Sequence, residues 1–513
     1  MSAEAIRTIP QIVATGQGPA LGAPGRPDLD YAGLAAQIAR TARQIAGLGL
    51  GPGDAVAIVA PNGPEMATAF LGVGSAAVAA PLNPAYREDE FAFYMEDLGA
   101  KALVVLEGAD TPARLAAARL NMRIVEMAVE DGAPAGAFTL TEDGGAVAEE
   151  DGRLNGPEDV ALVLHTSGTT SRPKIVPLTA RNVCASAFHI AGTLAIAPGD
   201  RCLNVMPLFH IHGLIAAVLT TLAGGGFIAC TPGFNAMKFF GWMEEVKPTW
   251  YTAVPTMHQA ILARAERNAE IIKANPLRFV RSSSASLPLP VFRQIEETFG
   301  CPMIEAYGMT EASHQMASNQ LPPGKRKPGS VGMAAGPEVA IMGEGGALLP
   351  RGAVGEIVIR GENVTPGYQN NPKANAENWT EGWFRTGDQG IMDEDGYLTI
   401  SGRLKEIINR GGEKVSPREV DDVLLEHPAV DQAVTFALPH DKLGEDVAAV
   451  IVLKEGATAT AAEIRDFAGK QLAAFKTPRE IIFVTEIPKG ATGKLQRIGL
   501  AEKLGLVKQE ASA

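Results

Sequence analysis

The segment HTSGTTSRPK, residues 165–174, combines hydroxyl side chains, a glycine and a lysine, and it directly follows the aliphatic run VALVL at residues 160–164. Hydroxyl groups and exposed backbone amides bind phosphate oxygens, and a lysine neutralises their charge. The segment is not a Walker A loop, which requires Gly-x4-Gly-Lys-Ser/Thr. Its composition still favours a loop that wraps a polyphosphate over the alternative of a solvated, hydroxyl-rich loop.

A second segment, EAYGMTE at residues 305–311, places a hydroxyl and a carboxylate side by side. Thr310 and Glu311 are a typical partial shell for Mg²⁺ that is shared with phosphate oxygens. Tyr307 offers an aromatic face on which a base can stack. Taken alone, the segment favours the alternative of a loop that carries an exposed glutamate.

Three further segments present single polar side chains in glycine-rich surroundings: GWFRTGDQG at 382–390, SGRLKE at 401–406 and PKGATGKLQR at 488–497. The first contains Asp388, which suits ribose hydroxyls. The second contains Arg403 and Lys405, and the third presents Lys494. Each segment by itself is also compatible with an ordinary solvated surface loop.

The first 400 residues alternate short aliphatic runs with helical patterns, which predicts an α/β fold with largely parallel sheets covered on both faces. Strands are predicted at residues 55–61, 102–106, 160–164, 249–254, 278–283 and 302–308. Ligands of such sheets bind at the carboxyl ends of the strands. The segments TSGTTSRPK, SSSAS and YGMTE each follow one of these strands, so we expect them to share one site.

The pattern changes near residue 336, where short strands at 339–343 and 355–361 alternate with Gly/Pro turns, as in a small β-barrel-like subdomain. Capping boxes at Ser416 and Thr460 predict two helices, and strands are predicted at 432–438 and 447–453. We therefore expect a large N-terminal domain of layered sheets and helices at 1–404. A small, mobile α+β domain follows at 405–513.

The overall composition suits a cytoplasmic globular protein and disfavours several ligand classes. The net charge of −13 argues against nucleic acid or an anionic membrane surface as a partner. The four cysteines are scattered, so neither a zinc site nor a disulfide framework is indicated, and no secretory signal is seen. Residues 202–237 contain no charged side chain, but histidines, a proline and glycines interrupt the run, which favours a buried helix over a membrane span. The oligomeric state is not indicated.

In their order and number, the five polar segments resemble those of the adenylate-forming acyl-CoA synthetase superfamily, over residues 30–500. The resemblance implies ATP, Mg²⁺ and CoA as cofactor and co-substrates. It implies that Lys494 is the catalytic lysine, that Thr310 and Glu311 assist catalysis with Glu311 on the metal, and that Lys405 is the hinge. It places the following residues against ATP or AMP: Thr166, Ser167, Gly168, Thr169, Thr170, Lys174, Ser284, Ala285, Ser286, Glu305, Ala306, Tyr307, Gly308, Thr310, Asp388 and Arg403.

The segments TSRPK at 170–174, HIHG at 210–213 and TEASH at 310–314 look most like those of oxalate–CoA ligases. The resemblance implies that Ser284 and His314 contact the acid, and His210 and His212 are further candidates for the acid site. Oxalate carries a second carboxylate bonded to the first, and burying that charge unpaired costs several kcal/mol. A histidine and a hydroxyl near the reacting carbon would pair with this second carboxylate. A buried histidine that only orients a loop is the alternative for His314. For His210 and His212, gating or loop packing is an equally good alternative to contact with the substrate.

Three other functions stay open at this point. A ligase for malonate or another short acid is one, although no arginine follows Pro207 before Arg264. A luciferase-like oxygenase is the second, and a non-catalytic nucleotide-binding relative is the third. The third gains some support from Ile175, because the family usually has glycine after the lysine of the phosphate loop. If that position needs a positive φ, isoleucine is strained there. Either the loop accepts an extended conformation at Ile175, or ATP affinity and turnover are reduced, and Ile175→Gly is expected to raise activity or tighten ATP binding.

Overall fold

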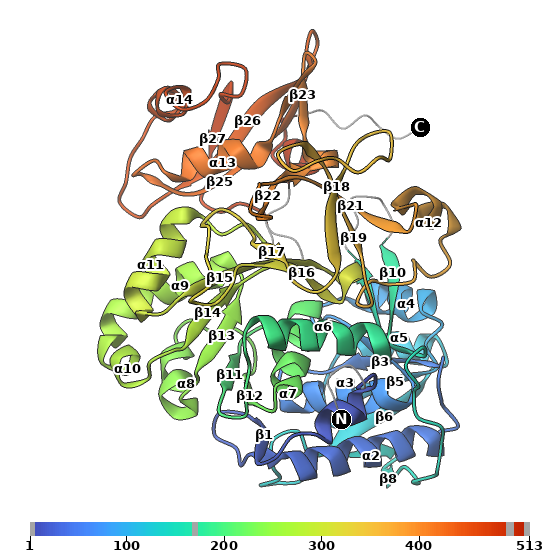
Figure 1. Cartoon of the computed structure of the whole chain (residues 1–513). Coiled ribbons are helices and arrows are strands. Elements are labelled where there is room, and N and C mark those ends of the chain that lie inside the picture. The colour runs from blue at the N-terminus through green and yellow to red at the C-terminus, as the bar shows by residue number, and fades with distance from the viewer. Residues whose placement is uncertain (1–5, 167–172, 489–496, 507–513) are drawn as a thin grey trace. The chain divides into compact units, whose positions relative to one another are not determined.

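The computed structural model describes residues 6–166, 173–488 and 497–506. The chain forms two compact units, each assembled from separate stretches of sequence. The first unit comprises Met1–Leu287, Arg293–Val339 and Ile359–Phe384. The second unit comprises Pro288–Phe292, Ala340–Val358 and Arg385–Ala513. The fold is mixed α/β, with a large N-terminal part and a smaller C-terminal part, as the alternation of strand and helix patterns predicts (Figure 1).

The nine-stranded sheet of the first unit positions the acid-site and adenine-site segments. Its core strands β12, β11, β13, β14 and β15 are parallel, and β16 joins β15 in antiparallel orientation. Helices α8, α9 and α10 lie beside these strands in Figure 1. In spatial order the strands are β17 (Met333–Ala334), β16 (His314–Ser318), β15 (Met303–Met309), β14 (Phe279–Ser282), β13 (Trp250–Ala253), β11 (Arg201–Asn204), β12 (Phe227–Cys230), β1 (Pro19–Gly22) and β2 (Leu29–Asp30).

The eight-stranded sheet of the first unit positions the two ends of the phosphate-loop segment. It has a parallel centre, and antiparallel strands flank it at both edges. In spatial order the strands are β10 (Lys174–Thr179), β9 (Val160–Thr166), β4 (Val78–Pro81), β3 (Ala55–Val59), β5 (Ala102–Leu106), β6 (Arg123–Ala128), β7 (Thr139–Glu142) and β8 (Gly145–Ala146).

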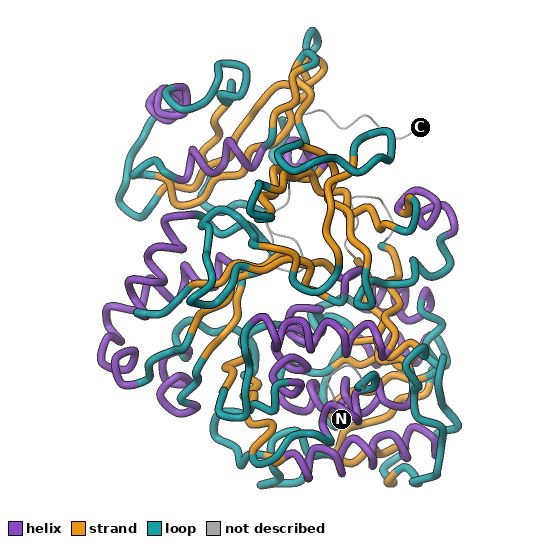
Figure 2. The backbone as a smooth tube through the Cα atoms, in the orientation of Figure 1, coloured by secondary structure: helices purple, strands orange, loops and turns teal. Residues whose placement is uncertain are grey.

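Helices alternate with these strands along the chain, as the purple and orange segments of Figure 2 show. Local sequence fixes several helix starts: Asp30 caps α2 by accepting the backbone N–H of Gly33, and Pro64 opens α3 at a position where no donor is needed. The longer helices of the first unit are α2 (Tyr31–Gly47), α3 (Pro64–Ala76), α4 (Glu88–Asp97), α5 (Pro112–Arg119), α6 (Ala180–Thr193), α8 (Phe239–Val246), α9 (Pro255–Ala265), α10 (Ala269–Ala274) and α12 (Pro372–Asn378).

The uncharged stretch at 202–237 forms several short elements rather than one long helix. It contains most of β11, a π-helix at His212–Leu219, the short α7 (Thr220–Ala223) and β12. The π-helix is completely buried. None of the described helices combines the length and apolar character that a membrane span requires. Most of residues 202–231 are buried in the first unit, which accounts for their apolar character, whereas Pro232, Asn235 and Met237 are exposed.

The second unit contains its own sheet and core. β26 (Gly444–Leu453) pairs with β25 (Val430–His440), β27 (Glu480–Phe483) and the end of β23 (Ile408–Arg410), and β23 forms a hairpin with β24 (Glu413–Val415). Helices α13 (Pro417–Leu425) and α14 (Ala461–Gly469) begin at the two predicted caps, because Ser416 and Thr460 accept backbone N–H groups three residues on. The short α15 (Leu500–Lys503) packs on β25.

The predicted glycine-rich β region is formed by short and medium strands near the sequence boundary between the units. These are β18 (Glu338–Met342), β19 (Val354–Arg360), β20 (Trp379–Thr380), β21 (Trp383–Met392) and β22 (Leu398–Arg403). The boundary passes through β18, β19 and β21. Within the second unit, β21 and β22 are antiparallel, and their pairing aligns Asp388 with Arg403.

Candidate active site

The two ends of the phosphate-loop segment lie side by side in the first unit. β9 and β10 are antiparallel, and their register makes Thr166 and Lys174 direct partners. The two residues that flank the hydroxyl-rich stretch are therefore neighbours in the sheet. Ser167, Gly168, Thr169 and Thr170 lie outside the described residues.

Ile175 occupies an ordinary strand position, which supports the alternative of an extended conformation and removes the reason to expect strain there. It pairs with His165 in the β9–β10 ladder and is absent from the residues with positive φ. Its side chain is 4% exposed and packs in the core cluster that includes Val163. Ile175→Gly would remove a core side chain and add backbone entropy to the unfolded state, so we expect it to lower stability rather than raise activity.

A tyrosine that the sequence analysis did not single out connects Lys174 with Glu311. The Tyr368 hydroxyl donates to Glu311 Oε1 at 2.7 Å, and Lys174 Nζ lies 4.5 Å from the centroid of the Tyr368 ring. The backbone N–H of Thr365 also donates to the Glu311 carbonyl. The segment around Tyr368 thus joins the two predicted phosphate-binding residues, although more than 130 positions separate them in the sequence. The sequence around Tyr368 contains no motif that predicts its contacts with Glu311 and Lys174.

Thr310 and Glu311 form the short 3-10 helix Thr310–Ala312, immediately after β15. Glu311 is buried, with 5% of its surface exposed, and Thr310 is partly exposed. In the described part of the chain, no cluster of three or more His, Cys, Asp and Glu side chains forms a closed metal site. A single carboxylate beside a hydroxyl fits Mg²⁺, since that ion keeps water and takes phosphate oxygens as its other ligands.

The predicted adenine wall forms where β14 and β15 end next to each other. Ser282 pairs with Glu305 across the strands, and the Ser283 hydroxyl donates to the Ala306 carbonyl at 2.8 Å. Glu305, Ala306 and Tyr307 are buried, whereas Gly308 is half-buried. Ser284 adopts a left-handed backbone with φ of 73°, and Ala285 and Ser286 are exposed. The two strands thus bring these predicted residues together at one sheet edge.

Two of the three histidines assigned to the acid lie together in the first unit, and one of them binds Ser284. His212 Nδ1 is 3.0 Å from Ser284 Oγ, and His212 Nε2 is 2.6 Å from Thr252 Oγ1. The rings of His212 and His314 are 5.0 Å apart, centroid to centroid. His212 and His314 are buried. His210 is only half-buried, and its Nδ1 accepts the backbone N–H of His212, so it braces the turn that carries His212.

The backbone around His314 is unusual and depends on a glycine. Ser313 and His314 have φ values of 49° and 103°, which non-glycine residues seldom adopt. The carbonyl oxygen of His314 approaches Gly308 so closely that a Cβ there would lie 1.9 Å from it. The Ser186 hydroxyl also donates to the Ser313 carbonyl at 2.6 Å. This turn fixes the direction of the His314 side chain, and such local strain is common at functional sites.

Arg281 contacts His212 and Thr252, and the sequence analysis does not predict it as a site residue. It is on β14 and is fully buried, and burial lowers the pKa of its guanidinium to about 9. Its Nη2 donates to Gln315 Oε1 at 3.2 Å. Its Nη1 lies 3.5 Å from both Thr252 Oγ1 and His212 Nε2. All of these partners are neutral oxygen or ring nitrogen atoms.

In the second unit, Asp388 and Arg403 form an ion pair between β21 and β22, with Arg403 Nε 3.2 Å from Asp388 Oδ1. Asp388 is buried and Arg403 is exposed, so the pair presents one face to solvent. Lys405 is exposed in the 3-10 turn Leu404–Glu406. Lys494 lies outside the described residues.

Arg497 lies three positions after Lys494 and is held by two carboxylates of the second unit. Its guanidinium contacts Asp421 at 2.5 Å and Glu406 at 3.3 Å, and it donates to the Thr435 carbonyl. Burial opposes its charge, but the two carboxylates outweigh that effect and raise its pKa. The pair with Glu406 ties the segment after Lys494 to the turn that contains Lys405.

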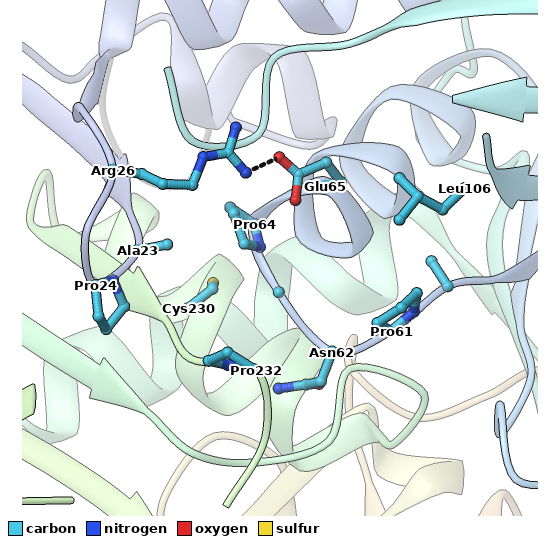
Figure 3. Close-up of a pocket in the computed structure, with 12 residues that line it drawn as sticks. Ala23, Pro24, Arg26, Pro61, Asn62, Pro64, Glu65, Leu106, Cys230 and Pro232 are labelled. Atoms are coloured by element: carbon cyan, nitrogen blue, oxygen red, sulfur yellow. Dashed lines mark hydrogen bonds and ion pairs between the residues drawn. The ribbon is translucent and has the colours of Figure 1, made fainter. Parts of the chain in front are cut away.

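A separate cavity of about 190 Å³ lies in the first unit near the start of α3 (Figure 3). Arg26 and Glu65 form an ion pair beside it, and Asn62, Cys230 and Pro232 also line it. Glu65 further accepts the backbone N–H of Gly136, so the polar groups of this cavity bind one another. None of the predicted site residues lines it.

Comparisons with known proteins identify the family of the chain. Residues 11–369 match the AMP-binding enzyme family, and residues 419–494 match the AMP-binding enzyme C-terminal domain. The chain is 45% identical to an oxalate–CoA ligase of Arabidopsis thaliana over 93% of this chain and 94% of that one. It is 44% identical to an oxalate–CoA ligase of Saccharomyces cerevisiae, over 88% and 86% of the two chains. The crystal structure of ATP-bound MatB from Rhodopseudomonas palustris matches with a TM-score of 0.85 and 29% identity, over 97% and 99% of the chains. The chain therefore belongs to the AMP-binding enzyme family.

Proposed function

We propose that this protein is an AMP-forming acid–CoA ligase and that its acid substrate is oxalate. The observation that carries the proposal is the polar cluster of His212, Ser284 and His314, in which two imidazole rings and a hydroxyl gather at the end of β14. A fatty or aromatic acid would require an apolar wall in their place. The relatives at 44–45% identity, which are named oxalate–CoA ligases, support the same choice of acid.

In the first half-reaction, a carboxylate oxygen of oxalate attacks the α-phosphorus of ATP. The bond from that phosphorus to the bridging oxygen breaks, and pyrophosphate leaves with the electron pair. Negative charge accumulates on the phosphate oxygens, so cations placed in advance stabilise the transition state. Lys174 and Lys494 are the lysines that we assign to this task, with Thr166 and the hydroxyl-rich stretch after it around the β- and γ-phosphates.

We propose that Mg²⁺ binds together with the phosphates of ATP. When bound, it withdraws charge from the phosphate oxygens and holds them in place. Glu311 supplies the protein carboxylate, and the hydroxyl of Tyr368 fixes the orientation of that carboxylate. Thr310 supplies a neighbouring hydroxyl for a phosphate oxygen.

In the second half-reaction, the thiolate of CoA attacks the carbonyl carbon of the oxalyl adenylate, and AMP leaves with one oxygen that came from oxalate. This step needs no cation at the pyrophosphate position. We therefore assign residues 405–513 as a lid that delivers Lys494 only for the first step, with Lys405 as the hinge. We assign residues 411–417 to the pantetheine arm: Gly411 and Gly412, both exposed and with positive φ, form the turn between β23 and β24.

The remaining assignments concern the nucleotide and the compartment. Tyr307 would lie against adenine, and the Asp388–Arg403 pair would hold the ribose hydroxyls. The four cysteines are buried and free, which suits a reducing compartment, and we assign the protein to the cytoplasm.

The test is an acid panel in which AMP release is measured with and without CoA, using oxalate, malonate, glycolate and acetate. We expect oxalate to give the highest kcat/KM, with a product that requires CoA. A preference for malonate would show that the substrate is malonate and would leave the proposed reaction type unchanged. Oxygen uptake or light would instead indicate an oxygenase, and no AMP release with any acid would contradict the proposal.

A further inference from the structure

The core of the first unit contains a cation, Arg281, that has no anionic partner among residues 6–166, 173–488 and 497–506. Arg281 is 0% exposed, and in the described part of the chain it forms no ion pair with a carboxylate. Its Nε makes no hydrogen bond there, and two of its three polar contacts are at the 3.5 Å limit. Keeping an uncompensated charge in the interior is costly, so its presence calls for a functional reason.

The position of Arg281 connects it with the acid site through His212. Arg281 Nη1 and Thr252 Oγ1 both lie next to His212 Nε2, and His212 Nδ1 faces Ser284. A guanidinium can only donate, so it favours the tautomer in which Nε2 accepts and Nδ1–H donates to Ser284 Oγ. The Ser284 hydroxyl hydrogen is then left for another acceptor.

The open side of this chain of contacts is at Ser284. Ser284 is half-buried, and the next two residues, Ala285 and Ser286, are exposed. The positive charge of Arg281 and the hydroxyl hydrogen of Ser284 therefore have the same effect on a ligand at this position. Both favour an anionic group at the end of β14 over a neutral one of equal size.

We propose that Arg281 is a positioning residue that makes the acid site selective for a substrate with a second anionic group beside the reacting carboxylate, and that it acts through Thr252 and His212. The inference rests on the proposed function, because it concerns the acid site of that reaction. It goes further by naming the source of the charge selectivity. The substrate class is a short dianionic acid, and the bound anion supplies the partner that Arg281 lacks among the described residues.

The sharpest test changes the charge around Arg281 without removing it. Gln315→Glu places a carboxylate at the oxygen that now accepts from Arg281 Nη2, so the cation gains an ion-pair partner inside the protein. Gln315→Met is the matched control, since it removes the same hydrogen bonds to Arg281, Thr193 and Ala335 without adding charge. Arg281→Met removes the charge, and Arg281→Lys retains it.

The readout is the ratio of kcat/KM for oxalate to that for glycolate, which has a hydroxymethyl group in place of the second carboxylate. We expect Gln315→Glu and Arg281→Met to lower this ratio about tenfold or more, because a unit charge at this range acts strongly in a dry site. Gln315→Met and Arg281→Lys should stay within about threefold of the wild type. The KM for ATP should change little in any of them.

A purely structural role for Arg281 predicts a different result, in which activity on both acids and the KM for ATP change together. An unchanged acid ratio in Gln315→Glu, with the protein folded by circular dichroism, would overturn the inference even if Arg281→Met failed to fold. The proposed function is judged separately, from the wild-type panel. If the wild type preferred malonate, the same ratio measured with malonate would test Arg281. A wild-type preference for a monoanionic acid would refute the inference.

Discussion

Two arginines of this protein are held in opposite ways. Arg497, in the second unit, contacts the carboxylates of Asp421 and Glu406, and Asp421 is itself buried. Arg281, in the first unit, is more deeply buried, yet its partners are an amide oxygen, a hydroxyl and a ring nitrogen. A charge that the chain neutralises itself holds structure together. A charge that the chain leaves uncompensated is available to a ligand, and this difference separates the framework of the second unit from the acid site of the first.

The largest expected effect is on stability, and it should separate the two arginines. Arg497→Met leaves Asp421 as a buried carboxylate without its cation, which should lower the free energy of unfolding by roughly 3 kcal/mol or more. Arg281→Met removes an uncompensated buried charge and keeps an apolar side chain of similar length, so stability should change by about 1 kcal/mol or less. Urea denaturation of the three proteins measures both values. Equal losses of unfolding free energy in Arg497→Met and Arg281→Met would contradict the proposed difference between the two arginines.

A smaller expected effect separates the acid site from the ribose pair. His314→Ala should raise the KM for oxalate about tenfold or more with little change in the KM for ATP, while Arg403→Ala should do the reverse. Steady-state pyrophosphate release measures both constants. His314 has a positive φ, so His314→Asn, a residue that tolerates such a backbone, controls for strain. Oxalate kinetics unaffected in both His314 variants would take this side chain out of the acid site.

The smallest expected effect is the pH dependence of stability. The pKa of Arg281 is about 9 in the folded chain, below the ordinary value of 12.5, because of burial. Between pH 8 and 10 the folded chain therefore loses a proton that the unfolded chain keeps, and stability rises with pH. Relative to Arg281→Met, the wild type should gain about 1 kcal/mol over this range. The pKa of Arg497 is raised, so the difference between wild type and Arg497→Met should show no such gain. If the stability difference between the wild type and Arg281→Met did not change with pH, the burial of Arg281 without a compensating anion would be contradicted.

The sequence predicts the elements of this fold well, since their signals are local. The strands at 102–106 and 160–164 occur where aliphatic runs stand between turn residues, as β5 and β9. The helix starts at Ser416 and Thr460 follow from side chains that cap the backbone N–H three residues later. The stretch at 202–237 was harder to interpret, because a π-helix between two buried strands has the same apolar composition as a long helix.

The site is predicted less completely, because part of it depends on contacts between distant segments. Glu311 and His212 belong to recognisable segments, but Tyr368 and Arg281 reach them only through packing. Ile175 shows the opposite case, in which a departure from the family pattern suggests strain. The antiparallel pairing of β10 with β9 gives that residue an ordinary strand conformation and a place in the core.

The most direct test of the proposed reaction follows the oxygen atoms of oxalate. The enzyme would be incubated with ATP, CoA, Mg²⁺ and oxalate labelled with ¹⁸O in its carboxylates, and the nucleotide product analysed by mass spectrometry. If a carboxylate oxygen attacks the α-phosphorus and the thiolate then attacks the carbonyl carbon, each AMP formed with oxalyl-CoA must contain one ¹⁸O atom. Unlabelled AMP, or ADP with ¹⁸O in the released phosphate, would contradict the acyl-adenylate route on which this account of the site depends.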